Sequence, residues 1–158
     1  MNQLMNEQGI LIPVVSQEEW AVRRTHILLK MQAVMGSLPS EEKRCPLAIL
    51  IKEEVDCGSY LRRLISYRSE PGGLVPAYLL IPKVALAGNA ARAVLCLHQT
   101  TDLGHKEVVG LGGKASMAYA AELAKKGFVT LAPAYPHLSD YWPDLKALGY
   151  VSGTMKAI

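Results

Sequence analysis

The chain has 158 residues, of which half are hydrophobic and a fifth are charged, as in an ordinary globular protein. Lysine and arginine outnumber aspartate and glutamate by only 17 to 14, which is too small an excess to indicate nucleic-acid binding. No positively charged segment precedes an apolar core at the N-terminus, and no apolar run reaches the length of a membrane span, so the sequence predicts a cytoplasmic protein without a membrane partner.

The first predicted element is a helix that begins at a capping box, Ser16-Gln17-Glu18-Glu19, and ends at Gly36. Its apolar side chains recur at helical spacing, which favours a face that packs in a core. Arg23, Arg24 and Lys30 would also suit a helix on a membrane surface, but the glutamates of the first turn dilute that charge. The apolar positions are Trp20, Ile27, Met31, Val34 and Met35.

A polar linker with two prolines, residues 37–46, follows this helix. It separates the helix from the strand-forming part of the chain. The sequence therefore predicts an N-terminal helical segment with its linker at 1–46 and one domain at 47–158. A chain of this length is normally a single domain and can bury about two thirds of its unfolded surface.

Three strands are predicted in succession, at residues 47–55, 60–68 and 74–81. Glu70-Pro71-Gly72-Gly73 fits a type II turn between the last two, because proline presets the first central position and glycine accepts a positive φ at the second. These strands are therefore expected to form antiparallel hairpins. Pro76 cannot donate to a ladder, so its strand is expected to lie near a sheet edge or to carry a bulge.

Residues 92–133 contain an apolar strand, a glycine-rich loop, a helix of small residues and a second apolar strand. Residues 93–97 are apolar on both faces, which is typical of a strand buried in the middle of a parallel sheet. The helix ends at Gly127, and 128–132 form the next strand. This βαβ pattern predicts parallel pairing with a right-handed crossover. The apolar stripe of the helix consists of Met117, Ala120, Ala121 and Ala124.

The carboxyl ends of these two strands are where ligands gather in open α/β sheets, which directs attention to residues 98–106 and 134–141. A loop rich in proline, tyrosine and tryptophan continues to residue 150. Ser152 or Thr154 would then cap a helix that has only begun when the sequence stops. Because an isolated helical turn is unstable without continuation, the sequence predicts a truncated chain.

The glycine-rich loop, Gly110-Leu111-Gly112-Gly113-Lys114-Ala115, imitates two phosphate-binding signatures. As a Walker A loop it fails, because Val108 replaces the first glycine and Ala115 replaces the residue that binds magnesium. As a dinucleotide fingerprint its glycines lie about a dozen residues beyond the strand instead of in its tight turn. A flexible entry to the helix is therefore favoured over nucleotide binding, and no cofactor is predicted.

Histidines and cysteines give no metal-binding pattern. The four histidines include no HxH or HxxxH pair, so no metal site is predicted. His98 ends the first apolar strand, where we expect it to hydrogen-bond the loop backbone, with acid–base catalysis as the alternative. Cys45, Cys57 and Cys96 form an odd set without CxxC spacing, which indicates reduced thiols.

A serine nucleophile of the hydrolase type needs the strained strand-to-helix elbow GxSxG, and the sequence lacks it. Gly149-Tyr150-Val151-Ser152-Gly153 comes nearest, but its first glycine lies one residue too far from the serine, and no strand precedes it. Asp102, Asp140 and Asp144 have no identifiable partner base and nucleophile, so each is expected to be a loop or cap residue. The sequence therefore predicts no catalytic residue in this chain.

Four strings occur together in one order along the chain. They are residues 60–82 with the SEPG turn and VPAYLLIP, the string LCLHQTT at 95–101, residues 119–127 around AELA, and residues 128–136. Together they resemble the dienelactone hydrolase-like and acetyl xylan esterase-like α/β-hydrolases, over residues 15–158. The resemblance implies an α/β fold: the N-terminal half of a mixed, mostly parallel hydrolase sheet, with antiparallel N-terminal strands and a preceding helix.

The resemblance also implies a site. In this family the loop after the third strand supplies a backbone N–H to the oxyanion hole, where charge develops on a carbonyl oxygen during acyl transfer. The matching positions here are Gln99 and Thr100, with His98 supporting the loop. The implied substrate is a small-molecule ester or lactone, and the nucleophile, acid and histidine base of the family would lie beyond this sequence.

Two functions remain open on the sequence alone. The first is the N-terminal part of a serine-dependent ester or lactone hydrolase that is inactive alone. The second is a non-catalytic binding module, or a homodimeric or split-protein partner, because the strand at 93–97 would expose an apolar edge to another chain. Nucleotide binding is a distant third.

Overall fold

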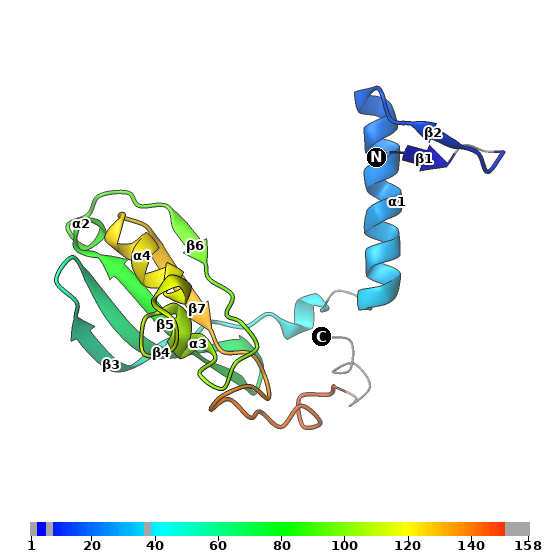
Figure 1. Cartoon of the computed structure of the whole chain (residues 1–158). Coiled ribbons are helices and arrows are strands. Elements are labelled where there is room, and N and C mark those ends of the chain that lie inside the picture. Colours follow the sequence, from blue (N-terminus) through cyan, green and yellow to red (C-terminus); the bar gives the residue numbers. More distant parts are fainter. Residues whose placement is uncertain (1–2, 6–7, 37–38, 151–158) are drawn as a thin grey trace. The chain divides into compact units, whose positions relative to one another are not determined.

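The computed structural model describes residues 3–5, 8–36 and 39–150. These residues form two compact units, which divide between Glu41 and Glu42 (Figure 1). The N-terminal unit contains a hairpin and one long helix, and the larger unit contains a five-stranded sheet.

The N-terminal unit begins with β1 (Gln3–Met5) and β2 (Leu11–Pro13), an antiparallel pair that the sequence did not predict. Helix α1 (Gln17–Met35) follows. Its capping box is confirmed, because the Ser16 hydroxyl accepts from the Glu19 N–H at 3.1 Å while the Glu19 carboxylate accepts from the Ser16 N–H at 3.2 Å. The end at Gly36 is confirmed as well, since that residue has φ 85° and donates its N–H to the Gln32 carbonyl.

The apolar stripe of α1 is not part of a core. No residue of this helix is buried, and the side chains of Val34 and Met35 are 82% and 72% exposed. The predicted core packing is therefore wrong for the described residues. Periodicity gives the face that an apolar stripe occupies, but burial also needs an opposing layer. A short hairpin supplies too little surface to cover five turns of helix.

The larger unit is a single sheet with the strand order β3-β4-β5-β7-β6. A short 3₁₀ helix, η1 (Glu41–Lys43), leads into it. The strands are β3 (Leu50–Asp56), β4 (Tyr60–Glu70), β5 (Gly73–Pro82), β6 (Ala93–Leu95) and β7 (Val129–Pro133).

The pairing of these strands is mixed. From β3 to β7 all neighbours are antiparallel, and β6 pairs with β7 in parallel. The predicted antiparallel hairpins and the predicted parallel βαβ unit are confirmed. The expectation of a mostly parallel sheet is wrong for residues 42–150, because this part of the chain holds a single pair of parallel neighbours. Two parallel neighbours must be joined by a crossover connection, as β6 and β7 are. The other neighbouring strands of this sheet run antiparallel.

The turn between β4 and β5 has the predicted chemistry, with Gly72 at φ 80°. The prediction for Pro76 is wrong: β5 has a neighbour on each side, and the register shift of its ladder with β4 falls between Arg68 and Glu70. The Pro76 carbonyl accepts from the Ala134 N–H at 2.9 Å. Pro76 lies one residue beyond Ala77, the last residue of β5 that is paired with β7. The position where Pro76 lacks an N–H therefore faces the β7 side just outside this ladder, and a proline is tolerated in an inner strand.

One face of the sheet is covered by α4 (Tyr119–Lys125), which packs against β5 and β7 (Figure 1). The predicted stripe is confirmed at Ala120, Ala121 and Ala124, which are buried. Small side chains let the helix backbone approach the sheet, and the Ala120 carbonyl accepts from the Thr130 hydroxyl at 3.2 Å. Three short elements were not predicted: α2 (Lys83–Leu86), α3 (His105–Val108) and the 3₁₀ helix η2 (Ala115–Met117).

The last strand, β6, is paired on one side only. Cys96 is buried against the α4 side, but the side chains of Leu95 and Leu97 are 58% and 52% exposed. The prediction that both faces of this strand are buried is therefore wrong in the described chain. A strand at the end of a sheet has one neighbour, and here only one of its faces has a covering layer.

Within the described ranges, no helix combines the length and the apolar character needed to cross a bilayer. The helix start predicted at Ser152 or Thr154, and most of the string nearest to GxSxG, lie outside the described residues.

Candidate functional site

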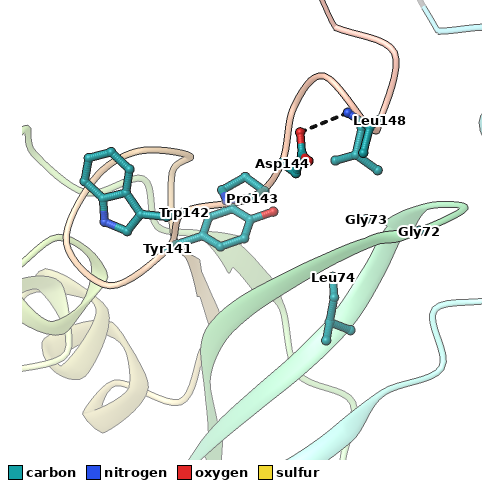
Figure 2. Close-up of a pocket in the computed structure, with 9 residues that line it drawn as sticks. Gly72, Gly73, Leu74, Tyr141, Trp142, Pro143, Asp144 and Leu148 are labelled. Carbon is teal, nitrogen blue, oxygen red and sulfur yellow. Dashed lines mark hydrogen bonds between the residues drawn. The ribbon is translucent and has the colours of Figure 1, made fainter.

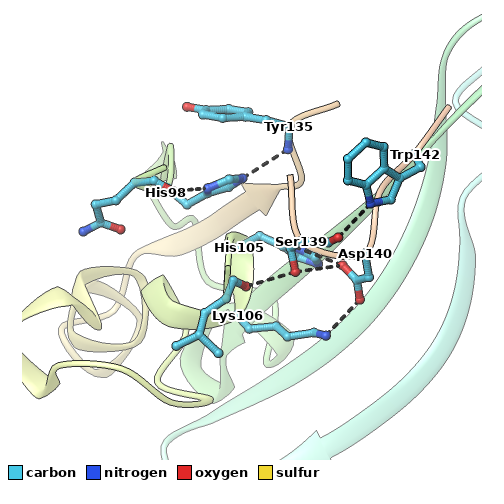
Figure 3. Close-up of polar contacts among 9 residues, drawn as sticks. His98, His105, Lys106, Tyr135, Ser139, Asp140 and Trp142 are labelled. Atoms are coloured by element: carbon cyan, nitrogen blue, oxygen red, sulfur yellow. Dashed lines mark hydrogen bonds and ion pairs between the residues drawn. The ribbon is translucent and has the colours of Figure 1, made fainter. Parts of the chain in front are cut away.

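His98 lies three residues beyond the end of β6 and contacts the segment after β7 (Figure 3). Its side chain is buried, and both ring nitrogens have partners. Nε2 accepts from the Tyr135 N–H at 3.1 Å, and Nδ1 lies 2.7 Å from the Gln99 carbonyl oxygen. Because a backbone N–H can only donate and a carbonyl can only accept, the proton must lie on Nδ1. His98 is therefore held as one neutral tautomer.

Tyr135 is the second residue after β7, and its ring stacks against that of His98 with centroids 4.1 Å apart. The two segments that the sequence singled out, 98–106 and 134–141, are thus in contact at the carboxyl ends of β6 and β7. The predicted loop contact of His98 is present, since the ring bonds the carbonyl of the next residue in its own loop. His98 also bonds the segment after β7, which the sequence did not indicate.

Gln99 and Thr100 are the residues that the family resemblance matched to an oxyanion loop. The Gln99 side chain is half-buried: its amide nitrogen lies 2.8 Å from the Met117 sulfur, and its Oε1 is buried without a partner among the described residues. Thr100 is exposed. The Gln99 carbonyl accepts from the Thr101 N–H at 3.0 Å. In the described part of the chain, the N–H groups of Gln99 and Thr100 donate to no protein acceptor.

His105 was not singled out by the sequence, yet it is the most buried titratable group near His98. It is 1% exposed, and its ring lies 5.1 Å from that of Tyr78. Burial lowers the pKa of His105 to about 4, and the nearby Asp140 carboxylate offsets only part of this effect. His105 is therefore neutral at neutral pH, with its Nδ1 3.9 Å from an Asp140 oxygen.

Asp140 forms an ion pair with Lys106 at 2.9 Å (Figure 3). Burial alone would raise the pKa of Asp140, but the hydrogen bond from Lys106, a backbone hydrogen bond and the charges of Lys106 and His105 together outweigh burial and leave the pKa lowered. The same hydrogen bond raises the pKa of Lys106. This pair ties the loop after β7 to helix α3. It also gives Asp140 a cationic partner, which the sequence did not indicate.

The loop around Asp140 is strained. His137 and Ser139 have φ values of 60° and 55°, in the left-handed region that non-glycine residues rarely adopt. The strain is held by local hydrogen bonds. The Ser139 hydroxyl lies 3.3 Å from an Asp140 oxygen, and the Trp142 indole N–H donates to the Ser139 carbonyl at 2.9 Å. Strain of this kind is found at functional loops.

The glycine-rich loop surrounds a buried carboxylate, that of Glu107. The Thr101 hydroxyl donates to one oxygen of Glu107 at 3.2 Å, and the Lys114 N–H lies 3.5 Å from the other. A Cβ on Gly113 would lie 2.4 Å from that second oxygen, so a side chain has no room there. A phosphate would meet a negative group in this loop. The arrangement therefore argues against the nucleotide-binding hypothesis.

A pocket of about 320 Å³ lies between the β4–β5 turn and residues 141–148 (Figure 2). Its lining is mostly apolar and includes Leu74, Tyr141 and Leu148. The Asp144 carboxylate accepts from the Ala147 N–H at 3.0 Å, which confirms its predicted role as a cap residue. No predicted site residue lines this pocket. Among the described residues, no group of three histidine, cysteine or acidic side chains could hold a metal ion.

The fold is similar to that of a solved esterase. The chain superposes on the structure of a putative acetyl xylan esterase from Bacteroides fragilis with a TM-score of 0.62 and 14% sequence identity. The chain has a hydrolase-like fold. The superposition covers 87% of this chain and 41% of the esterase chain, so this hydrolase-like fold spans less than half the length of that protein. No protein-family model and no curated protein matches the sequence.

Sequence reasoning located the two segments of the site but missed three of its side chains and the partner of a fourth, Asp140. Lys106 and Asp140 stand in those segments without a motif, and their pairing depends on how the two loops approach. Glu107 could have been suspected, because a glycine-rich loop without a phosphate signature needs another reason for its glycines. His105 and its burial under Tyr78 gave no signal in the sequence.

Proposed function

We propose that this chain is the N-terminal part of a serine-dependent hydrolase that cleaves a small-molecule ester or lactone. It supplies the oxyanion loop, and it is inactive without a nucleophile from outside residues 1–158. One observation carries the proposal. His98 is buried at the end of β6, and its two ring nitrogens fix the loop that contains Gln99 and Thr100.

Oxyanion stabilisation requires donors that are already in position when charge develops, because reorganisation during the reaction would cost rate. The loop from Leu97 to Thr101 meets this requirement. Its backbone is bonded by the His98 ring, and its side chains are bonded from the segment that precedes α4. The N–H groups of Gln99 and Thr100 have no protein acceptor in the described chain. They are the two donors that a carbonyl oxygen would meet.

The missing groups define what else the enzyme needs. Acyl transfer to serine requires a nucleophile, a histidine base and an acid that orients the histidine. The sequence has no GxSxG elbow, and His98 is occupied by two hydrogen bonds, so it is not free to act as the base. The similarity to the esterase, over 41% of that protein, is consistent with these groups being carried by a further segment.

The direct test is the size and reactivity of the native polypeptide. An antibody against residues 92–106 would detect it in source cells, and an alkyl fluorophosphonate would label a reactive serine on it. We expect a labelled polypeptide well above 17.2 kDa. A native polypeptide of 17.2 kDa that takes no label and shows no partner would contradict the proposal.

A second candidate function is favoured by a different observation, the exposure of Leu95, at the end of the edge strand β6, and of Leu97 just beyond it. A strand edge with apolar side chains can add a strand from another chain. In this case the protein would be a non-catalytic partner that associates through β6. Size-exclusion chromatography with light scattering distinguishes the two: a stable monomer that Leu95→Lys leaves unchanged would count against association.

A further inference from the structure

Glu107 is a carboxylate that is 6% exposed, in a helix of one turn. Burying a carboxylate is costly unless hydrogen bonds replace its water. Here the partners come from two different segments. Thr101, in the loop after β6, donates its hydroxyl at 3.2 Å, and Lys114, at the end of the glycine-rich loop, turns its N–H toward the other oxygen at 3.5 Å. Glu107 thus links both loops.

The glycine-rich loop is shaped around this carboxylate. Gly113 has φ 74°, and a Cβ at this position would lie 2.4 Å from Glu107 Oε1 and 2.8 Å from its Cγ. A larger residue would displace the carboxylate. Gly110 and Gly112 also adopt positive φ values and let the chain curve back toward Glu107. The motif that imitates a phosphate cradle is therefore filled by an acidic side chain of its own chain.

Besides the contacts of His98, three side-chain contacts join the loop after β6 to residues 107–119. The contacts are the Tyr119 hydroxyl to the Leu97 carbonyl, the Gln99 amide nitrogen to the Met117 sulfur at 2.8 Å, and the Thr101 hydroxyl to Glu107 at 3.2 Å. A thioether is a weak acceptor, whereas a carboxylate is a strong one. Among these contacts, that of Glu107 is expected to restrain the end of the loop most.

We propose that Glu107 is a positioning residue for the candidate oxyanion loop. It acts through Thr101 on one side and through the glycine-rich loop on the other, and it does not touch the substrate. The glycine-rich loop then serves as a brace for Gln99 and Thr100. The catalytic meaning of this inference rests on the proposed function, whereas the restraint of the loop does not.

The test is ¹⁵N NMR relaxation of the 158-residue chain, which reports the backbone order of each loop in the folded state. In Glu107→Gln we expect the order parameters of Thr100 and Lys114 to fall from about 0.85 to below about 0.6, with β4 and β5 unchanged. Glu122→Gln is the matched control, because Glu122 is an exposed glutamate paired only with Lys125. Loss of stability alone would lower the unfolding midpoint without changing these order parameters.

Two further variants keep the proposal falsifiable if Glu107→Gln does not fold. Thr101→Val removes one hydroxyl at nearly constant volume and should loosen Thr100 but leave Lys114 ordered. Gly113→Ala should displace the carboxylate and loosen both. Unchanged order at Thr100 in Thr101→Val and in whichever Glu107 or Gly113 variant folds would overturn the proposal.

The catalytic part has its own readout in the active polypeptide, once that is in hand. Glu107→Gln should lower kcat at least tenfold with KM little changed, because a loosened donor weakens binding of the transition state more than that of the substrate. A native polypeptide without esterase activity would overturn the proposed function and leave the loop restraint standing. Unchanged kcat in an active enzyme would instead overturn the positioning role.

Discussion

The two faces of β6 and its extension differ sharply. On one face, Cys96 and His98 are buried under α4 and the loop after β7, and both ring nitrogens of His98 have a partner. On the other, Leu95 and Leu97 are more than half exposed. Leu95 lies beside Leu131, and Leu131 lies beside Leu79, so the exposed side chains continue an apolar row across the sheet.

The described residues thus cover one face of β6 and its extension and leave the other face exposed. The loop that contains Gln99 and Thr100 is held on the buried face, by contacts within residues 97–135. The exposed face carries the apolar side chains of Leu95 and Leu97. It belongs to the one parallel strand pair, β6 with β7, among the described residues. The contacts that hold the candidate oxyanion loop therefore all come from within the sheet unit, whereas the face with Leu95 and Leu97 is exposed among the described residues.

Substitution of the buried face of β6 should have the largest effect. Cys96→Lys places an unpaired charge among Tyr78, Leu80 and Ala132, and should destabilise the chain by about 4 kcal/mol or prevent folding. Leu95→Lys, the neighbouring residue on the open face, should change stability by less than about 0.5 kcal/mol. Urea unfolding measures both. Equal losses for the two variants would mean that the reverse face is already covered.

Acid should destabilise the folded chain through His105, which is buried on the same face as His98. Its pKa is lowered from 6.5 in the unfolded chain to about 4 in the folded one. The unfolded state therefore takes up a proton first, and stability present above pH 6.5 is lost as the pH falls toward 4. The loss should reach about 3 kcal/mol, since one pKa unit corresponds to about 1.4 kcal/mol. Urea midpoints from pH 7 to pH 4 measure it, and a His105→Phe variant should lack this part of the slope.

Removal of the His98 ring should lower the free energy of unfolding by less than Cys96→Lys does, because water can enter the vacated site. His98→Ala loses two hydrogen bonds and the stacking with Tyr135, and should lower stability by about 2 kcal/mol. His26→Ala, on the exposed surface of α1, is the control. The amide signals of Gln99 and Tyr135 should shift together in His98→Ala. A shift confined to Gln99 would contradict the link between the two strand ends.

The smallest effect is expected at Glu70, where β4 turns into β5. Burial would raise the pKa of Glu70, but hydrogen bonds from Lys43 at 2.5 Å and Tyr150 at 2.8 Å outweigh it and lower the pKa. A lowered carboxyl pKa gives stability that is present above pH 4.5 and is lost below it. Glu70→Gln should therefore be less stable than the wild type at pH 7 and closer to it at pH 3. A gap that does not narrow would contradict this.

Local patterns in the sequence were enough for much of the fold. The capping box at Ser16 and the glycine at position 72 of the turn were predicted because their chemistry involves residues only a few positions apart. The βαβ unit followed from apolar runs separated by a helical stripe. For the candidate site, the sequence located the two loops that meet. It did not give the partners of Lys106 or Glu107, because those contacts join loops whose approach is set by the sheet.

The sequence by itself determined the order and type of the main elements, the absence of a GxSxG elbow, and the position of His98 at the end of a strand. These depend on short-range periodicity and turn chemistry. Only the tertiary structure decided that Pro76 fits an inner strand, that no side chain of α1 is buried among the described residues, and that Glu107 fills the glycine-rich loop. Each of these depends on which distant segment lies opposite, and burial and hydrogen bonding are properties of that pairing.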